Sequence, residues 1–293
     1  MKSVSAIIVT YNRKEMLLEC INSLKNQSYS IDEIIIINNC STDGTTDMLK
    51  EFKETLTIIN LDKNIGGAGG FNNGIKYAYN KGYDLFWLMD DDTIPENNAL
   101  EILLDEYAVL NENENIGFLA SDVLWKDKKP CLMNIVTPLS VFNEFIERGN
   151  VKIQKATFVS LLLTKQAVKK CGLPIKEFFI WADDAEFTYR VSKVFDNYLI
   201  GKSKVIHKMN YNMNADIVKD NNRIERYYYE YRNKFYNRKK WGGKAVLLHL
   251  FDLLKTIVNI ILKSDKNKLK KIGVLFKGTI AGVVFNPRIE YIE

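Results

Sequence analysis

Three consecutive aspartates are the strongest chemical signal in the sequence. Asp90, Asp91 and Asp92 directly follow the apolar run Leu85–Met89, which is typical of a strand buried on both faces. Carboxylates this close raise one another's pKa, and a divalent cation that prefers oxygen ligands removes the conflict. Such a cation could also bind a diphosphate and stabilise it as a leaving group. A solvated acidic helix N-terminus is the alternative, but the buried strand favours the metal site.

A second acidic group and a histidine could complete a catalytic site. Asp183, Asp184 and Glu186 follow Trp181 at an expected helix start. A carboxylate there could act as a general base beside an aromatic face that stacks on a sugar, or it could simply cap the helix. His207 follows a short apolar run. A single histidine is more often structural, but this one could complete an Asp/Asp/His metal site.

A glycine-rich segment over residues 64–72 could approach a ligand closely. Glycines expose backbone N–H groups, which suit phosphate. The segment resembles a dinucleotide-binding loop only weakly, because it follows the third expected strand and lacks the usual acidic partner. We expect a loop here, followed by a helix around Phe71–Tyr79, and a flexible loop without a ligand is the alternative.

Secondary structure must bring these residues together, and the hydrophobic pattern of the first half of the chain predicts a suitable fold. Helical spacing alternates with short apolar, β-branched runs, which predicts a mostly parallel sheet with helices on both faces. Ligands of such sheets bind beyond the carboxyl ends of the strands. We expect a helix that starts near Pro95, and later two short strands at Tyr198–Ile200 and Lys204–Ile206. The strands expected in the first half are Val4–Thr10, Glu33–Asn38, Leu56–Asn60, Leu85–Met89 and Ile116–Ala120.

Composition excludes several classes of protein. The chain has 293 residues with 46% hydrophobic and 26% charged, which argues against disordered and collagen-like chains. A net charge of +5 does not by itself indicate a nucleic-acid partner, and we expect none. The 4 cysteines lack zinc-site spacing, and the apolar N-terminal run is too short for a signal peptide. The expected location is the cytoplasm.

The composition changes after about residue 209. Residues 245–262 are apolar but interrupted by His249, Asp252 and Lys255, and basic residues flank this stretch across 238–277. We saw no clear membrane-spanning segment. A peripheral contact with the inner face of the plasma membrane fits this pattern, and so does a core helix or a helix of a homo-oligomer. Residues 227–233 are expected to pack or to line an acceptor cleft.

Taken together, these motifs resemble those of one family. The chain resembles family 2 glycosyltransferases of the GT-A fold, within them the bacterial galactofuranosyl- and rhamnosyltransferase branch. The resemblance covers about residues 4–210. It rests on IIVTYNR (7–13), NNCSTDGT (38–45), NIGGAGGFNNGI (64–75), WLMDDDTIP (87–95), WADDAEFTYR (181–190) and His207.

The resemblance implies a role for each matching residue. Asp184 would be the general base, and Asp90, Asp92 and His207 would hold Mn²⁺ or Mg²⁺. Acceptor hydroxyls would be held by Asp183 and Glu186, near Trp181. The donor nucleotide sugar would be bound by Thr10, Tyr11, Asn12, Arg13, Asn38, Asn64, Gly66, Gly67, Gly69, Gly70, Asp90 and Asp91.

Two positions depart from the family pattern. Asn38 stands where the family usually has an acid that recognises uracil or thymine, and Cys40 replaces a common glycine. The amide of Asn38 could still offer a carbonyl to the ring N–H. The departure leaves the nucleotide preference open between a UDP-sugar and a dTDP-sugar.

The resemblance also implies a function and a division of the chain. The expected activity is inverting, metal-dependent transfer of galactofuranose from UDP-galactofuranose to a glycan or lipid-linked acceptor in cell-surface polysaccharide synthesis. A dTDP-rhamnose-dependent transferase and a non-catalytic binding subunit are the alternatives. Residues 1–120 would bind the nucleotide sugar, 121–208 would hold the acceptor and the base, and 209–293 would form a helical region.

Overall fold

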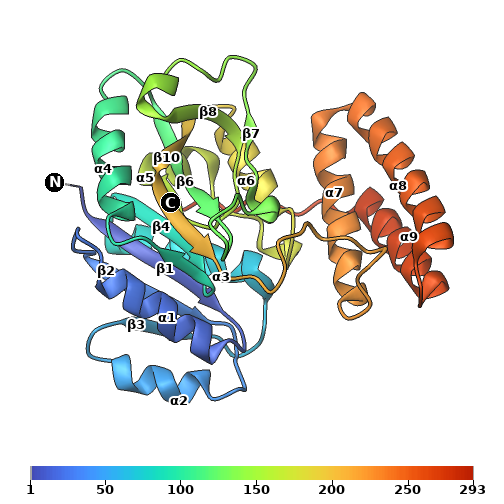
Figure 1. Ribbon diagram of the computed structural model, residues 1–293, viewed down its shortest axis with the longest axis horizontal. Helices are drawn as coiled ribbons and strands as arrows, with labels where there is room; N and C mark the ends of the chain where they lie inside the picture. Colours follow the sequence, from blue (N-terminus) through green and yellow to red (C-terminus); the bar gives the residue numbers. More distant parts are fainter. Residues whose placement is uncertain (1, 293) are drawn as a thin grey trace.

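The structure, a computed structural model, describes residues 2–292. Within these residues, a 10-stranded mixed sheet carries helices on both faces, and a group of helices follows at the C-terminal end (Figure 1). The strand order is β3-β2-β1-β4-β9-β6-β10-β8-β7, and β5 pairs with β10. The expected α/β architecture with an added helical region is therefore confirmed.

Four parallel strands form the first half of the sheet. β1 (Val4–Thr10) lies between β2 (Glu33–Asn38) and β4 (Leu85–Asp90), and β3 (Thr57–Asn60) lies beyond β2. Every residue of β1 is buried, as the continuous apolar pattern predicts for a strand covered on both faces. Because these strands are parallel, their carboxyl ends meet at one edge of the sheet.

The second half of the sheet is mixed. β9 (Leu161–Thr164) runs antiparallel to both β4 and β6 (Ile116–Leu124), whereas β6 and β10 (Asp196–His207) are parallel. An apolar run predicts a strand but not its direction, which pairing with distant strands decides. The sheet is completed by antiparallel pairs that involve β5 (Thr93–Pro95), β7 (Thr137–Pro138) and β8 (Asn150–Lys155).

Helices cover the two faces of the sheet with separate apolar layers. One layer packs beneath α1 (Lys14–Lys25), α2 (Thr45–Leu49) and α4 (Ala99–Leu110). The other packs beneath α3 (Gly66–Lys81), α5 (Lys165–Cys171) and α6 (Asp183–Val191). Alternate residues of β1 enter opposite layers, since Ile8 belongs to the first and Ile7 to the second.

Three expected elements differ in the structure. Residues 66–70 begin α3 instead of forming a loop, and the lack of a side chain at Gly70 and Gly74 lets this helix pack closely on β1. Pro95 ends β5, which pairs with β10, and the following helix begins only at Ala99. The two short strands expected at 198–206 form the single strand β10, with an irregularity between Ile200 and Lys204.

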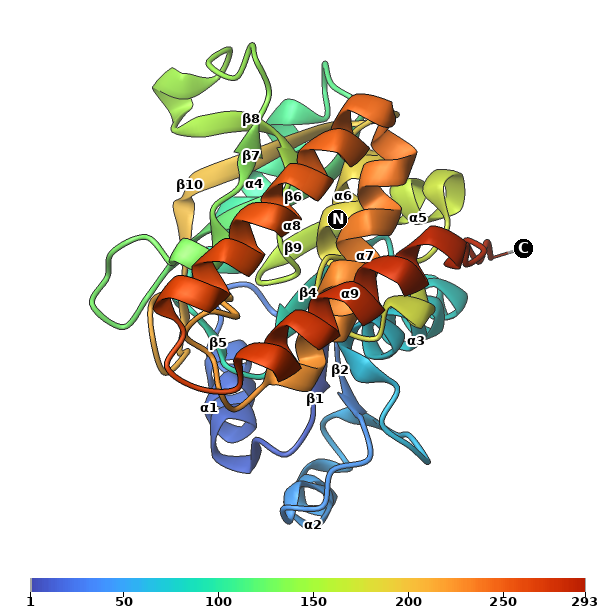
Figure 2. The same ribbon diagram turned by 90° about the vertical axis from the view of Figure 1, so that its right-hand side faces the viewer.

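The C-terminal helices pack against one another beside the sheet. α7 (Tyr227–Trp241) contacts the sheet domain, while α8 (Gly243–Lys263) and α9 (Lys268–Val284) cover its outer side (Figures 1 and 2). Among the described residues, α8 is the one helix that is long and apolar enough to cross a membrane, by length and composition only. The sequence had given no clear candidate, because Asp252 and Lys255 interrupt the apolar run.

Gly66 and Gly67 offer a matched test of the close packing at the start of α3. Gly66 has a φ of +75°, and a Cβ there would lie 1.9 Å from the carbonyl oxygen of Phe179, whereas a Cβ at Gly67 would meet nothing within 4 Å. We expect Gly66→Ala to lower the free energy of unfolding by at least about 2 kcal/mol. Gly67→Ala should change it by less than about 1 kcal/mol. Urea denaturation measures both, and equal effects would contradict this packing.

Candidate active site

The carboxyl ends of β1, β4 and β10 open into one large cleft. Its volume is about 1150 Å³, enough for a ligand of nucleotide-sugar size together with a second substrate. The start of α6 and residues 208–226 complete its walls. Of the residues predicted from the sequence, the structure places the following in the lining: Thr10, Tyr11, Asn12, Arg13, Asn64, Gly66, Gly67, Asp90, Asp91, Asp92, Trp181, Asp183, Asp184 and His207.

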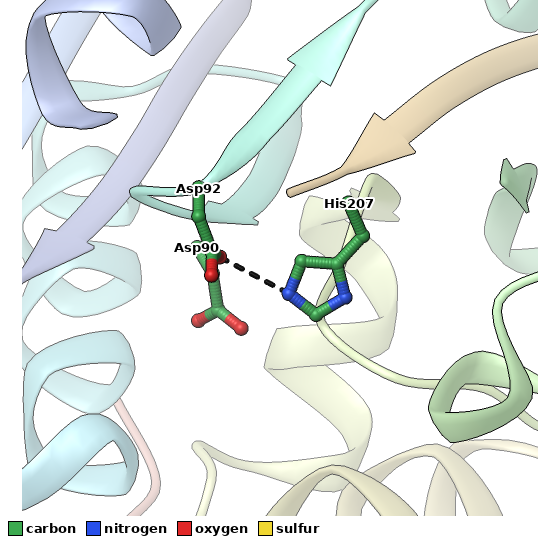
Figure 3. A group of neighbouring side chains, drawn as sticks. All are labelled: Asp90, Asp92 and His207. Carbon is green, nitrogen blue, oxygen red and sulfur yellow. Dashed lines mark hydrogen bonds and ion pairs between the residues drawn. The ribbon is translucent and has the colours of Figure 1, made fainter. Parts of the chain in front are cut away.

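Asp90, Asp92 and His207 form a group with the composition of a metal site. Their ligand atoms all lie within 4.8 Å of one another, and they come from the end of β4, the turn after it and the end of β10 (Figure 3). Nε2 of His207 lies 3.0 Å from Oδ1 of Asp92. On its other side, Nδ1 lies 2.8 Å from Oδ1 of Asn134, an acceptor that favours a proton on Nδ1. Burial opposes a charge on His207, but the hydrogen bond to Asp92 and the nearby carboxylates raise its pKa to about 10, so Nε2 carries a proton that faces Asp92. A divalent cation held by this group would take the place of that proton, because a metal ligand must be deprotonated.

Arg13 and Thr10 partly compensate the acidic charge, one through its positive charge and the other through a hydrogen bond. Oγ1 of Thr10 donates to Asp91 at 2.7 Å, and the guanidinium of Arg13 pairs with Asp91 at 3.5 Å and more closely with Asp92. The end of β1 therefore stabilises two of the three carboxylates that follow β4. The two strands are neighbours, which makes these contacts possible.

The pKa values show how strongly this site holds charge. Burial raises the pKa of Asp91 to about 7, against the lowering effect of Arg13. Burial also opposes ionisation of Asp92, but the hydrogen bond and charge of His207, together with Arg13, bring its pKa down to about 2. Burial and the charge of Asp92 raise the pKa of Asp90. The carboxylates are thus only partly compensated by protein groups, and a bound cation would supply the missing positive charge.

Two further carboxyl groups face the cleft from the start of α6. Burial, followed by the charge of Asp184, raises the pKa of Asp183 well above its usual range. Burial also raises the pKa of Asp184, to about 6, and the N–H of Ala185 bonds to its carboxylate at 2.6 Å. A pKa of about 6 leaves Asp184 mostly ionised at neutral pH. A carboxylate in this range suits a general base.

The loop before α6 is held in an unusual conformation by α7. Phe179, Trp181 and Ala182 all have φ near +65°, which is uncommon for residues other than glycine. The side-chain amide of Asn233 donates to the carbonyl oxygens of Phe178, Ile180 and Trp181 at 2.9, 3.1 and 2.9 Å. The amide of Asn237 donates to Ala182 at 3.1 Å. These contacts fix the position of Trp181 and of the carboxyl pair that follows it.

Four predicted site residues lie outside the cleft lining. Asn38 is buried, and its amide group bonds to Thr46 and Asn60. Gly69 and Gly70 pack against apolar side chains, where a Cβ would lie within 3.0 Å of Ile65 and Val9 respectively.

Glu186 is the fourth of these residues. It points to Arg190 one helical turn later, with two oxygen–nitrogen distances of 2.8 Å. Cys40, by contrast, has a φ of +62°, a conformation that suits the glycine it replaces.

The structure adds residues that the sequence did not identify. Asn39 accepts from the N–H of Ile65 at 2.9 Å and donates to the carbonyl of Gly66 at 3.0 Å, so it fixes the start of α3. Its place after a buried strand was an available signal. Arg223 and Arg226 also line the cleft. No local pattern marks them or Asn134, because they lie in or beside single 3-10 turns that are too short to show a periodicity.

The first strands and helices of the chain match a known family model. Residues 5–120 match the family model described as Glycosyl transferase family 2. The chain contains a glycosyl transferase family 2 domain. The resemblance to family 2, inferred from the motifs, is therefore confirmed for residues 5–120.

Curated relatives match the same region. The poly-beta-1,6-N-acetyl-D-glucosamine synthase of Staphylococcus epidermidis is 28% identical over 138 residues, which are 46% of this chain and 32% of the relative. The galactofuranosyltransferase GlfT1 of Mycolicibacterium smegmatis is 30% identical over 97 residues, 33% of this chain and 32% of the relative. The chain thus spans about a third of the length of these relatives.

Solved structures resemble a larger part of this chain than the curated relatives do. The structure of S. aureus TarS 1-349 in complex with UDP is similar with a TM-score of 0.53 at 16% identity. The similarity covers 93% of this chain and 69% of the TarS chain. The structure of GalNAc-T7 with UDP, GalNAc and Mn²⁺ is similar with a TM-score of 0.57 at 13% identity. The similarity covers 73% of this chain and 44% of the GalNAc-T7 chain. This similarity confirms the GT-A fold around the family 2 domain.

Asn233 provides a test of how α7 positions this site. We expect Asn233→Ala to lower the free energy of unfolding by about 2 kcal/mol, since the carbonyls of Ile180 and Trp181 lose a side-chain donor and that of Phe178 loses one of its donors. The exposed Asn113→Ala is the control and should change it by less than about 0.5 kcal/mol. Urea denaturation measures both variants. A neutral effect of Asn233→Ala would show that the loop is held by other contacts.

Proposed function

We propose that this protein is an inverting, metal-dependent glycosyltransferase that uses a nucleotide-activated sugar. One observation carries the proposal: the carboxyl pair of Asp183 and Asp184 and an Asp/Asp/His group face the same cleft, which is large enough for two substrates. In this reading, residues 1–120 bind the nucleotide sugar, residues 121–208 hold the acceptor and the base, and residues 209–293 form the helical region.

Asp184 is the general base of the proposed reaction. Its carboxylate takes the proton of an acceptor hydroxyl as that oxygen attacks the anomeric carbon. The bond from the anomeric carbon to the acceptor oxygen forms, and the bond to the diphosphate oxygen breaks with its electron pair. A single displacement inverts the anomeric centre, and no covalent enzyme intermediate is needed. Asp183 lines the cleft beside the base and can hydrogen-bond to an acceptor hydroxyl, while Trp181 offers its face to a sugar ring.

The leaving diphosphate requires positive charge. Asp90, Asp92 and His207 would hold Mn²⁺ or Mg²⁺, and the bound cation would stabilise the charge that develops on the diphosphate. Arg223 and Arg226 line the same cleft and can contribute hydrogen bonds to phosphate oxygens. Tyr11 and Asn12, at the end of β1, are placed to contact the nucleoside.

The proposed donor is UDP-galactofuranose, and the proposed acceptor is a glycan or a lipid-linked glycan of a bacterial cell-surface polysaccharide. Two comparisons support the donor: one curated relative is named a galactofuranosyltransferase, and the TarS neighbour was solved with UDP. A dTDP-rhamnose donor is the alternative. Asn38 does not favour either nucleotide, because its amide is engaged inside the protein.

Removal of the base gives the first test of catalysis. We expect Asp184→Asn to lower the rate of sugar transfer by at least about a hundredfold while nucleotide binding stays within about twofold. Asp122→Asn is a matched control, because burial raises the pKa of that carboxyl too but it lies outside the cleft lining. Equal loss of transfer and of nucleotide binding in Asp184→Asn would remove Asp184 from the role of base.

The pH dependence follows from the same carboxyl group. The pKa of Asp184 is raised to about 6, and the base must be ionised to accept a proton. Activity is therefore expected to be full above this pKa and to fall tenfold per pH unit below it. A rate profile of kcat between about pH 5 and 8 measures this, and a flat profile would contradict the assignment.

Calorimetry tests the metal and the donor together. We expect UDP to bind in the presence of Mn²⁺ and at least about tenfold more weakly without it, because the diphosphate and the carboxylates repel each other. Asp92→Asn should remove most of this metal dependence, whereas Asp122→Asn should retain it. A clear preference for dTDP would replace the galactofuranose donor with rhamnose. No binding of either nucleotide would favour a non-catalytic subunit with another ligand.

A further inference from the structure

The apolar side of α8 faces away from the protein. His249, Leu253 and Ile260 are its buried residues, and they pack inward towards α7 and α9. On a helical projection the exposed apolar residues lie together on another side, with Leu262 exposed to 72%. In the most apolar 18-residue stretch of α8, only 17% of the residues are buried. The exposed set consists of Leu247, Leu248, Leu250, Phe251, Leu254, Val258, Ile261 and Leu262.

α9 repeats this arrangement next to α8. Its buried residues, such as Val274, Leu275 and Gly278, face α7 and α8. Its exposed apolar residues recur on the opposite side at helical spacing: Leu269, Phe276, Ile280, Val283 and Val284. The two helices cover the outside of α7, at the end of the molecule away from the sheet (Figures 1 and 2). We call the thirteen exposed apolar residues of α8 and α9 the outer face.

Positive charge accompanies the outer face. Residues 238–277 contain 11 of the chain's 41 lysines and arginines, but only two of its 36 acids, Asp252 and Asp265. The basic side chains that are exposed beside the outer face or at the turn between the helices are Lys244, Lys255, Lys263, Lys266, Lys268, Lys270 and Lys277. Outside this segment, acids outnumber basic residues. The whole positive excess of the chain is therefore concentrated at the apolar end of the molecule.

We propose that the outer face is a docking surface for an anionic lipid bilayer, with α8 and α9 lying in the plane of the membrane interface. A wide apolar stripe flanked by lysines is the pattern of helices that insert one side into the headgroup region. The lysines add attraction to anionic headgroups, about 1 kcal/mol for each side chain near the surface. This proposal does not depend on the proposed function, because it concerns binding alone.

Charge and packing favour this occupant over the alternatives. Pairing with a second copy through the same face would bring two lysine-rich borders together, which costs free energy. A membrane-spanning α8 would place Asp252, Lys255 and His249 in the hydrocarbon region. A membrane-spanning α8 would also have to separate from α7. The ring centroid of His249 lies 5.4 Å from that of Phe235 in α7. Surface docking preserves all of these contacts.

The turn between α8 and α9 also connects the outer face to the cleft. Lys271 is buried, unlike the other lysines of this segment, and its Nζ donates to the carbonyl of Val218 at 2.8 Å. Oγ of Ser264 donates to the same carbonyl at 2.9 Å. Residues on both sides of Val218, namely Asp216 and Lys219, line the cleft. Docking through this turn would therefore hold the cleft close to the bilayer, where a lipid-linked acceptor would lie.

Vesicle flotation with the purified 293-residue chain tests the proposal. The vesicles contain phosphatidylcholine, either alone or mixed with phosphatidylglycerol. We expect binding to the mixed vesicles and at least about tenfold weaker binding to phosphatidylcholine alone, since the lysines lose their anionic partners. Phe251→Glu in the outer face should weaken binding to mixed vesicles by at least about tenfold.

Matched variants separate docking from general damage. Val109→Glu places the same charge on an exposed apolar residue of α4, and it should leave vesicle binding unchanged. Lys263→Gln with Lys266→Gln should weaken binding by about tenfold, whereas Lys53→Gln with Lys126→Gln should not. Circular dichroism and thermal unfolding of each variant confirm that it is folded. The side chain of Lys271 is left intact because it supports the fold.

Each outcome decides the proposal. Anionic-lipid binding that is lost in both outer-face variants and kept in both controls supports it. Absence of vesicle binding overturns it, and so does binding that the outer-face variants leave unchanged. Light scattering gives the mass in solution. A wild-type dimer that Phe251→Glu converts to a folded monomer would instead assign the face to a second copy.

Discussion

The crowding of carboxylates at the end of β4 is the constraint on which the rest of the site depends. Asp90, Asp91 and Asp92 are too close to remain ionised together without positive partners. The fold supplies partners from two different strand ends, with Arg13 after β1 and His207 at the end of β10. This compensation is incomplete, since the pKa of Asp91 remains near 7. The unsatisfied negative charge is what makes the site suited to a cation and, through it, to a diphosphate.

The proposed base, Asp184, must also lie near this charge without becoming part of the Asp/Asp/His group. The loop that carries Trp181 and precedes Asp184 has three non-glycine residues with positive φ, and such strain persists only when the surroundings impose it. Here α7 imposes it through amide side chains that bond to the loop carbonyls, chiefly that of Asn233. The C-terminal helices therefore have two roles in our interpretation. Their inner side fixes the catalytic loop, and their outer side is the proposed membrane contact.

Much of the first half of the fold could be predicted from local patterns. β1 and β2 have the predicted bounds, because continuous β-branched runs between turn residues permit little else. The motifs that indicate chemistry also lie where parallel strands end, so Thr10, Asp90 and Asp92 meet in the cleft as expected. The direction of β9 and the helical state of residues 66–70 could not be predicted, because both depend on packing against distant segments.

The sequence by itself therefore determined which groups could do chemistry and that they lie at strand ends, because residue types and their spacing are local properties. Only the tertiary structure decided which of these groups face the cleft. Asn38 and Glu186 resemble binding residues in sequence, but Thr46, Asn60 and Arg190 engage them elsewhere. In the same way, Lys271 is buried among a run of exposed lysines. A side chain's partners are set by elements far away along the chain, and no local pattern contains that information.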